Sequence, residues 1–236
     1  MFEGFSVTAV IPARSGSKGI INKNLQNLGK RSLLQMAIDV ALDCKFFDRI
    51  LVSTDSEDYA EHARQAGAEV PFLRPSELAG DNVKTACAVE DMLKRIGDAS
   101  DIILLLQPTA PFRGVDDISS ALELLSMRDD ANAVISVCEH EEPHPYKLKN
   151  ISQEGWLEPF MDSHSGGEAA RQTLPKVWRL NGAIYAVRRP VFFKEKTFHP
   201  VRSLPFVMPA ERSVNIDLPL DLLFARYCVE SGLVRI

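Results

Sequence analysis

A short basic loop near the amino terminus has the composition of a binding site for a polyphosphate. It follows the apolar residues 7–11 and Pro12, and it carries the cations Arg14, Lys18 and Lys23. Glycine lets the backbone approach a ligand, exposed N–H groups donate to phosphate oxygens, and fixed cations neutralise the anion. The loop therefore predicts a phosphate site, against the simpler alternative of a solvated basic turn.

The loop follows neither of two widespread phosphate-binding patterns. A dinucleotide-binding loop needs three glycines in the order G-x-G-x-x-G, and a Walker loop ends in Gly-Lys-Ser/Thr. Here the order is Lys18-Gly19, and a second lysine follows at position 23. An NAD-linked oxidoreductase is therefore not expected.

Asp217 is a second candidate for chemistry. It ends the apolar-alternating residues 213–217 and stands directly before a predicted helix. Mg²⁺ prefers hard oxygen ligands, usually one or two carboxylates together with phosphate oxygens. Asp217 can bind such an ion or cap the helix, and the local sequence leaves both roles open.

The elements that must position these groups alternate between strand and helix. Apolar runs predict strands at residues 6–11, 49–54, 69–73, 101–106 and 133–137, and the core returns at 181–187. One-sided apolar spacing predicts helices at residues 31–43, 56–66, 85–96, 115–127 and 218–232. This alternation predicts a mostly parallel sheet flanked by helices.

Polar side chains follow several of the predicted strands. They are Asp55, Arg74 with Glu77, Gln107 with Arg113, Arg171, Arg179 with Asn181, and Asp217. The carboxyl ends of parallel strands line one crevice, so these groups are expected to converge on one site. Each has a plainer alternative, because surface arginines are usually solvated or paired and an aspartate after a strand can cap a helix.

The chain of 236 residues suits a single α/β domain, residues 1–236, with a modest insertion. The rhythm breaks near Cys138, where a polar, proline-bearing stretch begins. Residues 139–180 are predicted to form an insertion between core strands, because this length buries little surface by itself.

Composition narrows the function classes. The chain is 45% hydrophobic and its net charge is -5, which argues against general nucleic-acid binding. Four widely spaced cysteines predict reduced thiols and a cytoplasmic location. We expect neither a secretion signal nor a membrane partner, because no charged leader and no apolar run of bilayer length is present.

Six segments form a joint pattern along the chain. They are residues 11–19 with 23–25, 52–55, 73–79, 106–113 (with Gln-Pro-Thr-Ala-Pro-Phe-Arg at 107–113), Arg179 with 181–185, and 213–217. In this order they resemble the acylneuraminate (nonulosonate) cytidylyltransferases, also called CMP-sialic acid synthetases. No single segment is specific, but the joint match spans nearly the whole chain.

The resemblance implies a Rossmann-like three-layer α/β sandwich of the nucleotide-diphospho-sugar transferase type, with a mostly parallel sheet. It also implies that the insertion at about 139–180 serves homodimerisation. The implied reaction transfers CMP from CTP to the anomeric hydroxyl of a nonulosonic acid and releases pyrophosphate. The implied cofactor is Mg²⁺ or Mn²⁺, and the CMP-sugar would supply lipopolysaccharide or capsule biosynthesis.

The resemblance also implies roles for particular residues. The nucleotide would be bound by Arg14, Ser17, Lys18, Lys23, Asn24, Arg74 and Thr85. The sugar would be bound by Gln107, Lys147, Arg171, Arg179, Asn181 and Tyr185. Arg14, Lys18, Lys23 and Asp217 would be catalytic, and Asp217 with Asn215 would hold the metal. The fork of Arg171 would suit the sugar carboxylate.

Three positions depart from the family pattern. Asn215 stands where many relatives have a second metal-binding aspartate, Ile21 stands where proline is common, and His199 follows Phe198 where relatives can present two aromatic rings. Asparagine offers a carbonyl oxygen but no charge. Because His199 stands in place of the second aromatic ring, the sugar substituents are expected to differ from those of relatives with two such rings.

Two rival functions remain. One is a related enzyme, a Kdo cytidylyltransferase or another sugar nucleotidyltransferase. The other is a catalytically weak nucleotide-binding homologue, which Asn215 keeps open. The identity of the nonulosonic acid, among N-acetylneuraminate, legionaminate and pseudaminate, is not encoded in any residue that can be singled out.

Overall fold

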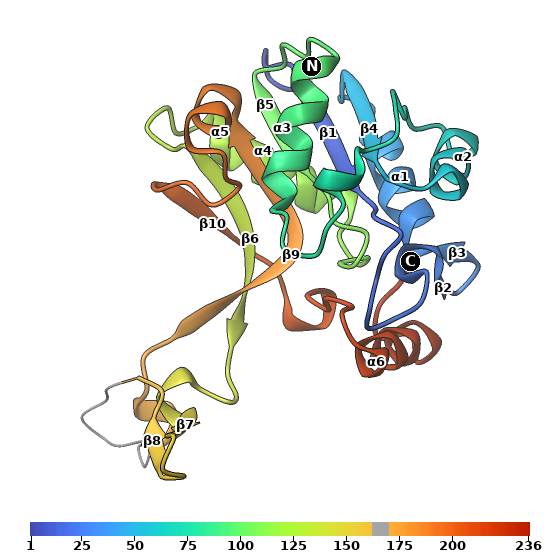
Figure 1. Ribbon diagram of the computed structural model, residues 1–236. Helices are drawn as coiled ribbons and strands as arrows, with labels where there is room; N and C mark the ends of the chain where they lie inside the picture. Colours follow the sequence, from blue (N-terminus) through green and yellow to red (C-terminus); the bar gives the residue numbers. More distant parts are fainter. Residues whose placement is uncertain (162–169) are drawn as a thin grey trace.

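A computed structural model of the chain describes residues 1–161 and 170–236, with Arg171 described for its backbone alone. Its centre is a six-stranded sheet in the order β10-β6-β9-β5-β1-β4 (Figure 1). The strands are β1 (Val7–Pro12), β4 (Arg49–Ser53), β5 (Ile102–Leu105), β6 (Ala133–His140), β9 (Val177–Arg188) and β10 (Ser203–Val207).

Strand direction confirms the predicted mostly parallel sheet. β1 runs parallel to both β4 and β5, and β10 runs parallel to β6. β9 is antiparallel to both of its neighbours, β5 and β6. The middle of β9 therefore passes the edge where β5 ends, with Tyr185 paired to Leu105, which brings a late segment of the chain to the predicted site.

Helices cover both faces of the sheet, which gives the three-layer sandwich. The helices are α1 (Leu33–Asp43), α2 (Glu57–Gln65), α3 (Thr85–Arg95), α4 (Val115–Ser126), α5 (Arg189–Glu195) and α6 (Pro219–Glu230). Val7, Ala9 and Ile11 of β1 pack with α1, α2 and α4, whereas Val10 packs with α3 and α5 on the opposite face. Successive strand residues point to opposite faces, so a fully buried parallel strand is apolar throughout.

Hydroxyl caps set two helix starts. The Ser32 side chain accepts a hydrogen bond from the Gln35 N–H at 3.0 Å, so α1 begins two residues later than the predicted start at Arg31. Ser56 caps α2 in the same way, as the sequence predicts. Each cap satisfies a backbone donor that has no partner within its helix.

The predicted strand at 69–73 is wrong in extent. The structure has a single parallel bridge there, between Leu51 and Glu69, beside the edge strand β4. Pro71 follows two residues later and has no N–H to donate, so the pairing cannot continue as a regular ladder. Shorter elements complete the body: β2 (Asn27–Leu28), β3 (Arg31–Ser32), η1 (Lys23–Leu25), η2 (Ser76–Leu78) and η5 (Ala210–Arg212).

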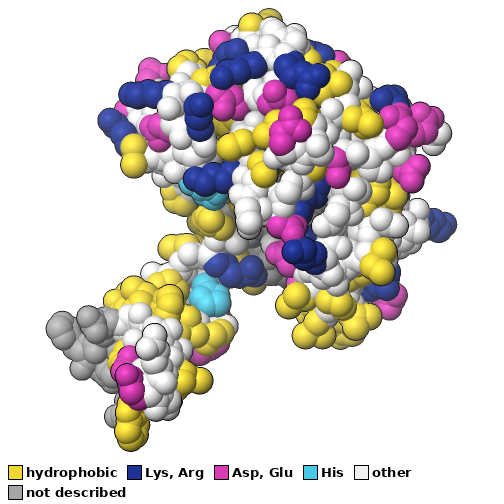
Figure 2. Space-filling model, in the orientation of Figure 1, with side chains coloured by type: hydrophobic (Ala, Val, Ile, Leu, Met, Phe, Trp, Pro, Cys, Tyr) yellow, Lys and Arg dark blue, Asp and Glu magenta, His cyan; other side chains and the backbone are white. Residues whose placement is uncertain are grey.

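The insertion projects from the body as an arm (Figure 1). β6 and β9 stay paired as far as His140 and Val177, so the arm leaves the sheet as a two-stranded extension. Beyond it lie η3 (Pro145–Lys147), β7 (Lys149–Ile151), β8 (Leu157–Pro159) and η4 (Arg171–Thr173). Figure 2 shows hydrophobic side chains gathered on this arm. Residues 162–169 of the predicted insertion lie outside the described part.

α6 packs beside the amino end of α1 in a third apolar cluster. Leu222, Ala225 and Cys228 of α6 lie buried there with Leu33 and Phe112. Among the described residues, no helix combines the length and the apolar character that a membrane span requires.

Candidate active site

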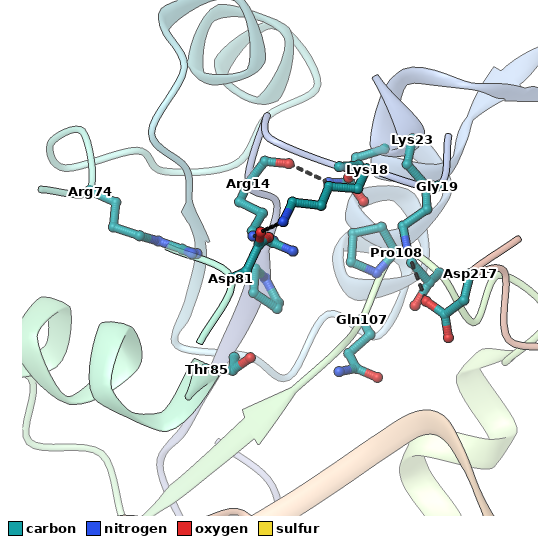
Figure 3. A pocket seen from close by; sticks show the side chains of 14 residues that line it. Arg14, Lys18, Gly19, Lys23, Arg74, Asp81, Thr85, Gln107, Pro108 and Asp217 are labelled. Carbon is teal, nitrogen blue, oxygen red and sulfur yellow. Dashed lines mark hydrogen bonds and ion pairs between the residues drawn. The ribbon is translucent and has the colours of Figure 1, made fainter. Parts of the chain in front are cut away.

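A pocket of about 330 Å³ lies where β1 and β5 end (Figure 3). Its lining combines the basic loop, the start of α3, the loop after β5 and the segment before α6. The lining residues are Pro12, Arg14, Ser17, Lys18, Gly19, Lys23, Asn24, Arg74, Asp81, Thr85, Gln107, Pro108, Thr109 and Asp217. The structure thus brings all seven predicted nucleotide-binding residues to one cavity.

Neighbouring elements hold the basic loop in place. The Ala13 N–H donates to the Ser53 carbonyl at the end of β4 (2.9 Å), and Asp55 accepts from both the backbone and the hydroxyl of Ser15. Buried Asn24 donates through Nδ2 to the Arg14 carbonyl at 3.1 Å. Asp55 and Asn24 therefore fix the loop backbone.

Gly19 permits a close approach between two distant segments. A Cβ atom at this position would lie 2.7 Å from the Asp217 carbonyl oxygen, which is closer than real Cβ contacts allow. Only glycine therefore lets the basic loop pack directly against the backbone of Asp217. This contact places the loop cations opposite the Asp217 carboxylate.

Asp81 lies between two cations of the pocket (Figure 3). Its Oδ1 accepts from Arg14 Nη1 at 2.5 Å, and its Oδ2 pairs with Lys18 Nζ at 2.6 Å. The hydrogen bonds from Lys18 and Arg14 lower the pKa of the Asp81 carboxyl. Asp81 is therefore ionised at neutral pH and partly neutralises this side of the pocket.

A second ion pair closes the opposite side. Lys23 Nζ donates to Asp217 Oδ1 at 2.8 Å, and Asn215 Nδ2 donates to Asp217 Oδ2 at 2.6 Å. The Lys23 side chain is only 16% exposed, whereas that of Asp217 is 60% exposed. Lys23 and Asn215 thus hold the Asp217 carboxylate, which remains accessible from the pocket.

These oxygens fit a Mg²⁺ ion that takes most of its ligands from phosphate and water. Asp217 supplies a hard, accessible carboxylate, and the Asn215 Oδ1 atom is buried without a hydrogen-bond partner. The described residues contain no group of three or more His, Cys, Asp or Glu side chains suited to a metal ion. Asn215 donates to Asp217 through Nδ2, so its unpartnered Oδ1 is the atom that the predicted metal-ligand role would use.

Arg74 forms another wall of the pocket. Its guanidinium donates to the Ser53 hydroxyl at 3.1 Å and to the Ser53 carbonyl at 2.8 Å. Burial lowers the pKa of Arg74, and nearby Asp55 opposes that shift. The planar donor group is thus positioned by the end of β4.

A buried arginine supports the loop after β5. Arg113 is 5% exposed, and its Nη1 donates to the carbonyls of Gln107 (2.8 Å) and Ala110 (2.6 Å). Burial lowers its pKa to about 9. The Thr109 carbonyl of the same loop accepts from the Ile216 N–H at 2.8 Å, so Arg113 and Ile216 together hold the loop beside Asp217.

Of the predicted sugar-binding residues whose side chains the structure describes, Gln107 alone lines the pocket. Asn181 is fully buried and bonds with Ser136 and Ser213, whereas Arg179 donates to the Ser213 carbonyl at 3.1 Å. Their neighbours Ser136 and Ser213 are both buried. Asn181 and Arg179 therefore connect β9 to β6 and to the segment that precedes α6.

Three other predicted sugar-binding residues lie away from the pocket. Lys147 is on the arm and pairs with Glu142 at 3.0 Å. Arg171 is also on the arm, and its side chain lies outside the described part. Tyr185 is buried in β9, with its ring 5.2 Å from that of His199 and 6.5 Å from that of Phe198. Burial raises the pKa of Tyr185 and lowers that of His199.

Asp81 is the pocket residue that the sequence analysis missed. It lies in the polar turn between Arg74 and Thr85, two residues assigned to the nucleotide. That position was the available signal, but a carboxylate in a turn has many solvated alternatives. Only its contacts with Arg14 and Lys18 reveal that it belongs to the pocket.

A family model described as cytidylyltransferase matches residues 8–212. The chain belongs to the cytidylyltransferase family. This membership confirms the predicted resemblance, and the basic loop, Arg74, Gln107 and Arg179 all fall within the matched residues.

Curated relatives place it in the nonulosonate branch. It is 34% identical to the N-acylneuraminate cytidylyltransferase of Streptococcus agalactiae serotype V over 91% of this chain and 51% of the relative. It is 34% identical to the CMP-N,N'-diacetyllegionaminic acid synthase of Legionella pneumophila over 91% and 92% of the two chains. The chain spans about half the length of the first curated relatives it matches.

Solved structures show the same fold. The structure of CMP:2-keto-3-deoxy-manno-octonic acid synthetase complexed with CTP superposes with a TM-score of 0.70 and 16% identity, over 96% and 99% of the two chains. A 4-diphosphocytidyl-2C-methyl-D-erythritol synthase from Anaerococcus prevotii gives 0.64 and 14% identity, over 97% and 100%. At these identities the likeness establishes the fold alone. It confirms the predicted α/β sandwich of the nucleotide-diphospho-sugar transferase type.

Proposed function

We propose that this cytidylyltransferase transfers CMP from CTP to the anomeric hydroxyl of a nonulosonic acid. The observation that carries the proposal is the pocket that gathers the cations Arg14, Lys18 and Lys23 together with the Asp217 carboxylate. Support comes from the relatives named for N-acylneuraminate, legionaminic acid and pseudaminic acid. The CMP-sugar would serve the synthesis of surface glycans such as lipopolysaccharide or capsule.

The main physical difficulty is charge repulsion between two anionic substrates. The anomeric oxygen attacks the α-phosphorus of CTP, and the bond from that phosphorus to the pyrophosphate oxygen breaks. Arg14, Lys18 and Lys23 neutralise the triphosphate and stabilise the departing pyrophosphate, because they act where negative charge accumulates. The lining contains no side chain that stands out as a general base for the sugar hydroxyl.

Asp217 is the residue that would hold Mg²⁺ or Mn²⁺, with Asn215 beside it. When bound, such an ion polarises phosphoryl oxygens and neutralises their charge. Lys23 and Asn215 hold the carboxylate through its two oxygens. Hydrogen bonds from two sides orient the Asp217 carboxylate toward the open pocket.

The nucleotide and the sugar would occupy different parts of this edge. Asn24 would hold the loop beside the nucleotide, while Arg74 and Thr85, which line the pocket, would lie near its cytosine and ribose. Gln107 faces the sugar side. We propose that Lys147 and Arg171 reach the sugar from the arm of a second copy, because both lie on the arm that projects from the body and neither lines the pocket of its own chain.

The arm supports the proposal of a homodimer. Ile151, Trp156 and Leu157 are each at least 70% exposed, and apolar surface of this kind is typical of an interface.

All four cysteines of the chain are free, which supports a location in the reducing cytoplasm.

A panel of acceptors tests the function. The enzyme is incubated with Mg²⁺, CTP or UTP, and each of N-acetylneuraminate, legionaminate, pseudaminate and Kdo, and pyrophosphate release is measured. We expect release with CTP and one of the three nonulosonic acids. Release with Kdo alone would favour the rival function, a Kdo cytidylyltransferase. CTP binding without turnover on any acceptor would identify a silent homologue.

A further inference from the structure

The Asp81 carboxylate has a position that the proposed reaction does not explain. It binds Arg14 and Lys18 at 2.5 and 2.6 Å, and both cations are assigned to the triphosphate of CTP. It lines the pocket, and Figure 3 shows its carboxylate next to the ends of Arg14 and Lys18. A carboxylate at this point occupies the donors that phosphate oxygens need.

We propose that Asp81 competes with the triphosphate for Arg14 and Lys18, so that nucleotide binding must displace it. This inference rests on the proposed function, because it assumes that CTP occupies this pocket. In the free enzyme the Asp81 carboxylate pairs with both Arg14 and Lys18 and so reduces the repulsion between these two cations. The ligand exchanges that pairing for contacts with phosphate, and the exchange lowers the net affinity for CTP.

The segment that carries Asp81 has only local backbone hydrogen bonds among those of the described residues. Residues 79–84 connect η2 to α3, and their backbone hydrogen bonds run to neighbours within the same stretch: Ala79 to Ser76, Val83 to Gly80, and Cys87 back to Lys84. The Asp81 side chain is 36% exposed. Its ion pairs are therefore the principal link between this turn and the basic loop.

The same displacement would affect the nucleotide wall. α3 begins at Thr85, four residues after Asp81, and Thr85 lines the pocket. When Asp81 leaves Arg14 and Lys18, the turn before α3 becomes free to settle against the ligand. Asp81 thus couples the occupancy of the phosphate cations to the position of the Thr85 side of the pocket.

The charge of Asp81 acts in both states. In the free enzyme it competes for the two cations, and as a carboxylate that lines the same pocket it also repels the negatively charged triphosphate. Its lowered pKa means that the competition operates throughout the neutral range and is lost only at strongly acidic pH. Removing the charge should therefore strengthen nucleotide binding, whereas removing a metal ligand would weaken it.

The test is CTP binding by Asp81→Asn, measured by calorimetry without acceptor sugar, with and without Mg²⁺. Two partly exposed ion pairs predict that the Kd for CTP falls about 3- to 10-fold in both conditions. Asp81→Ala should show the same direction, and Asp81→Glu should stay near the wild-type value. The exposed Asp129, in the connection from α4 to β6, provides the matched control Asp129→Asn, whose Kd should not change.

Inorganic triphosphate is the second probe, because it reports on the phosphate cations without the base. An unchanged or higher Kd for both ligands in Asp81→Asn would overturn the inference. Weaker binding only with Mg²⁺ would also overturn it and assign Asp81 to the metal. Failure of the wild-type chain to bind CTP would instead count against the proposed function. Thermal melting of each variant verifies that it is folded.

Discussion

The pocket and the arm show opposite ways of using exposed residues. The pocket places cations and carboxylates at the ends of buried strands, where Asp55, Ser53 and Arg113 hold the surrounding loops. On the arm, every residue of β7 and β8 is exposed. Preorganised charges need a rigid support, whereas an apolar surface without a core of its own needs something to cover it.

The body and the arm also differ in what stabilises them. A two-stranded hairpin is marginal by itself in water, and the arm ends in the hairpin β7–β8. The body has apolar clusters on both faces of its sheet. Substitutions in the pocket should therefore change chemistry without unfolding the body, and substitutions on the arm should change assembly.

Lys18→Ala should have the largest effect. Lys18 is 84% exposed, so its loss should leave the fold intact while it removes a cation from the triphosphate. We expect kcat to fall about 100- to 1,000-fold, as for the loss of one transition-state donor. Lys30→Ala, at an exposed lysine outside the pocket lining, is the matched control. Near-normal pyrophosphate release by Lys18→Ala would refute the role of the basic loop.

Asp217→Ala should reduce activity about 100-fold, a change of roughly 3 kcal/mol in the activation barrier. The physical reason is the loss of the exposed carboxylate assigned to the metal, while Lys23 loses its partner. Initial rates across a Mg²⁺ titration are the measurement. If Asp217→Ala keeps the wild-type rate and the wild-type Mg²⁺ dependence, Asp217 is only a structural residue before α6.

The double variant Trp156→Ser/Leu157→Ser tests the arm side of the comparison. Truncating a buried aromatic anchor costs about 2 kcal/mol or more, so the dimer Kd should rise at least 30-fold. Sedimentation or light scattering should show monomers where the wild type is dimeric, with little change in the melting temperature of the body. A wild-type chain that is monomeric at high concentration would contradict the proposed homodimer.

Gly182→Ala should have the smallest effect, on the free energy of unfolding. Gly182 has φ +77°, and an added Cβ would lie 2.8 Å from Gln107 Oε1. Gly97 has φ +64° and open space around it, so Gly97→Ala carries the backbone strain alone. We expect both to destabilise by about 1 kcal/mol through backbone strain, with a further loss only in Gly182→Ala. Equal losses in denaturant unfolding would mean that Gln107 turns aside freely.

Local patterns predicted most of the fold. The apolar run at 102–105 and the one-sided spacing of α1, α3 and α4 gave the helix-flanked sheet, because burial repeats with the period of each element. The short strand at 69–73 was overestimated, since its pairing depends on β4 and stops before Pro71. The basic loop could be predicted as part of the pocket, because a short loop that combines glycines with several cations after an apolar strand is unusual in composition. Arg74 and Thr85, which line the same pocket, were expected only from the family resemblance.

Sequence alone therefore determined the layers, the basic loop and Asp217 as a candidate. Tertiary structure decided which groups meet: Asp81 with Arg14 across 67 positions of sequence, and Lys23 with Asp217 across 194. Three further features also depend on the tertiary structure: β9 is antiparallel to its neighbours, Asn181 is buried, and Lys147 lies on the arm. Helix and strand periods are local properties, whereas ion pairs between distant loops depend on how the whole chain closes around its sheet.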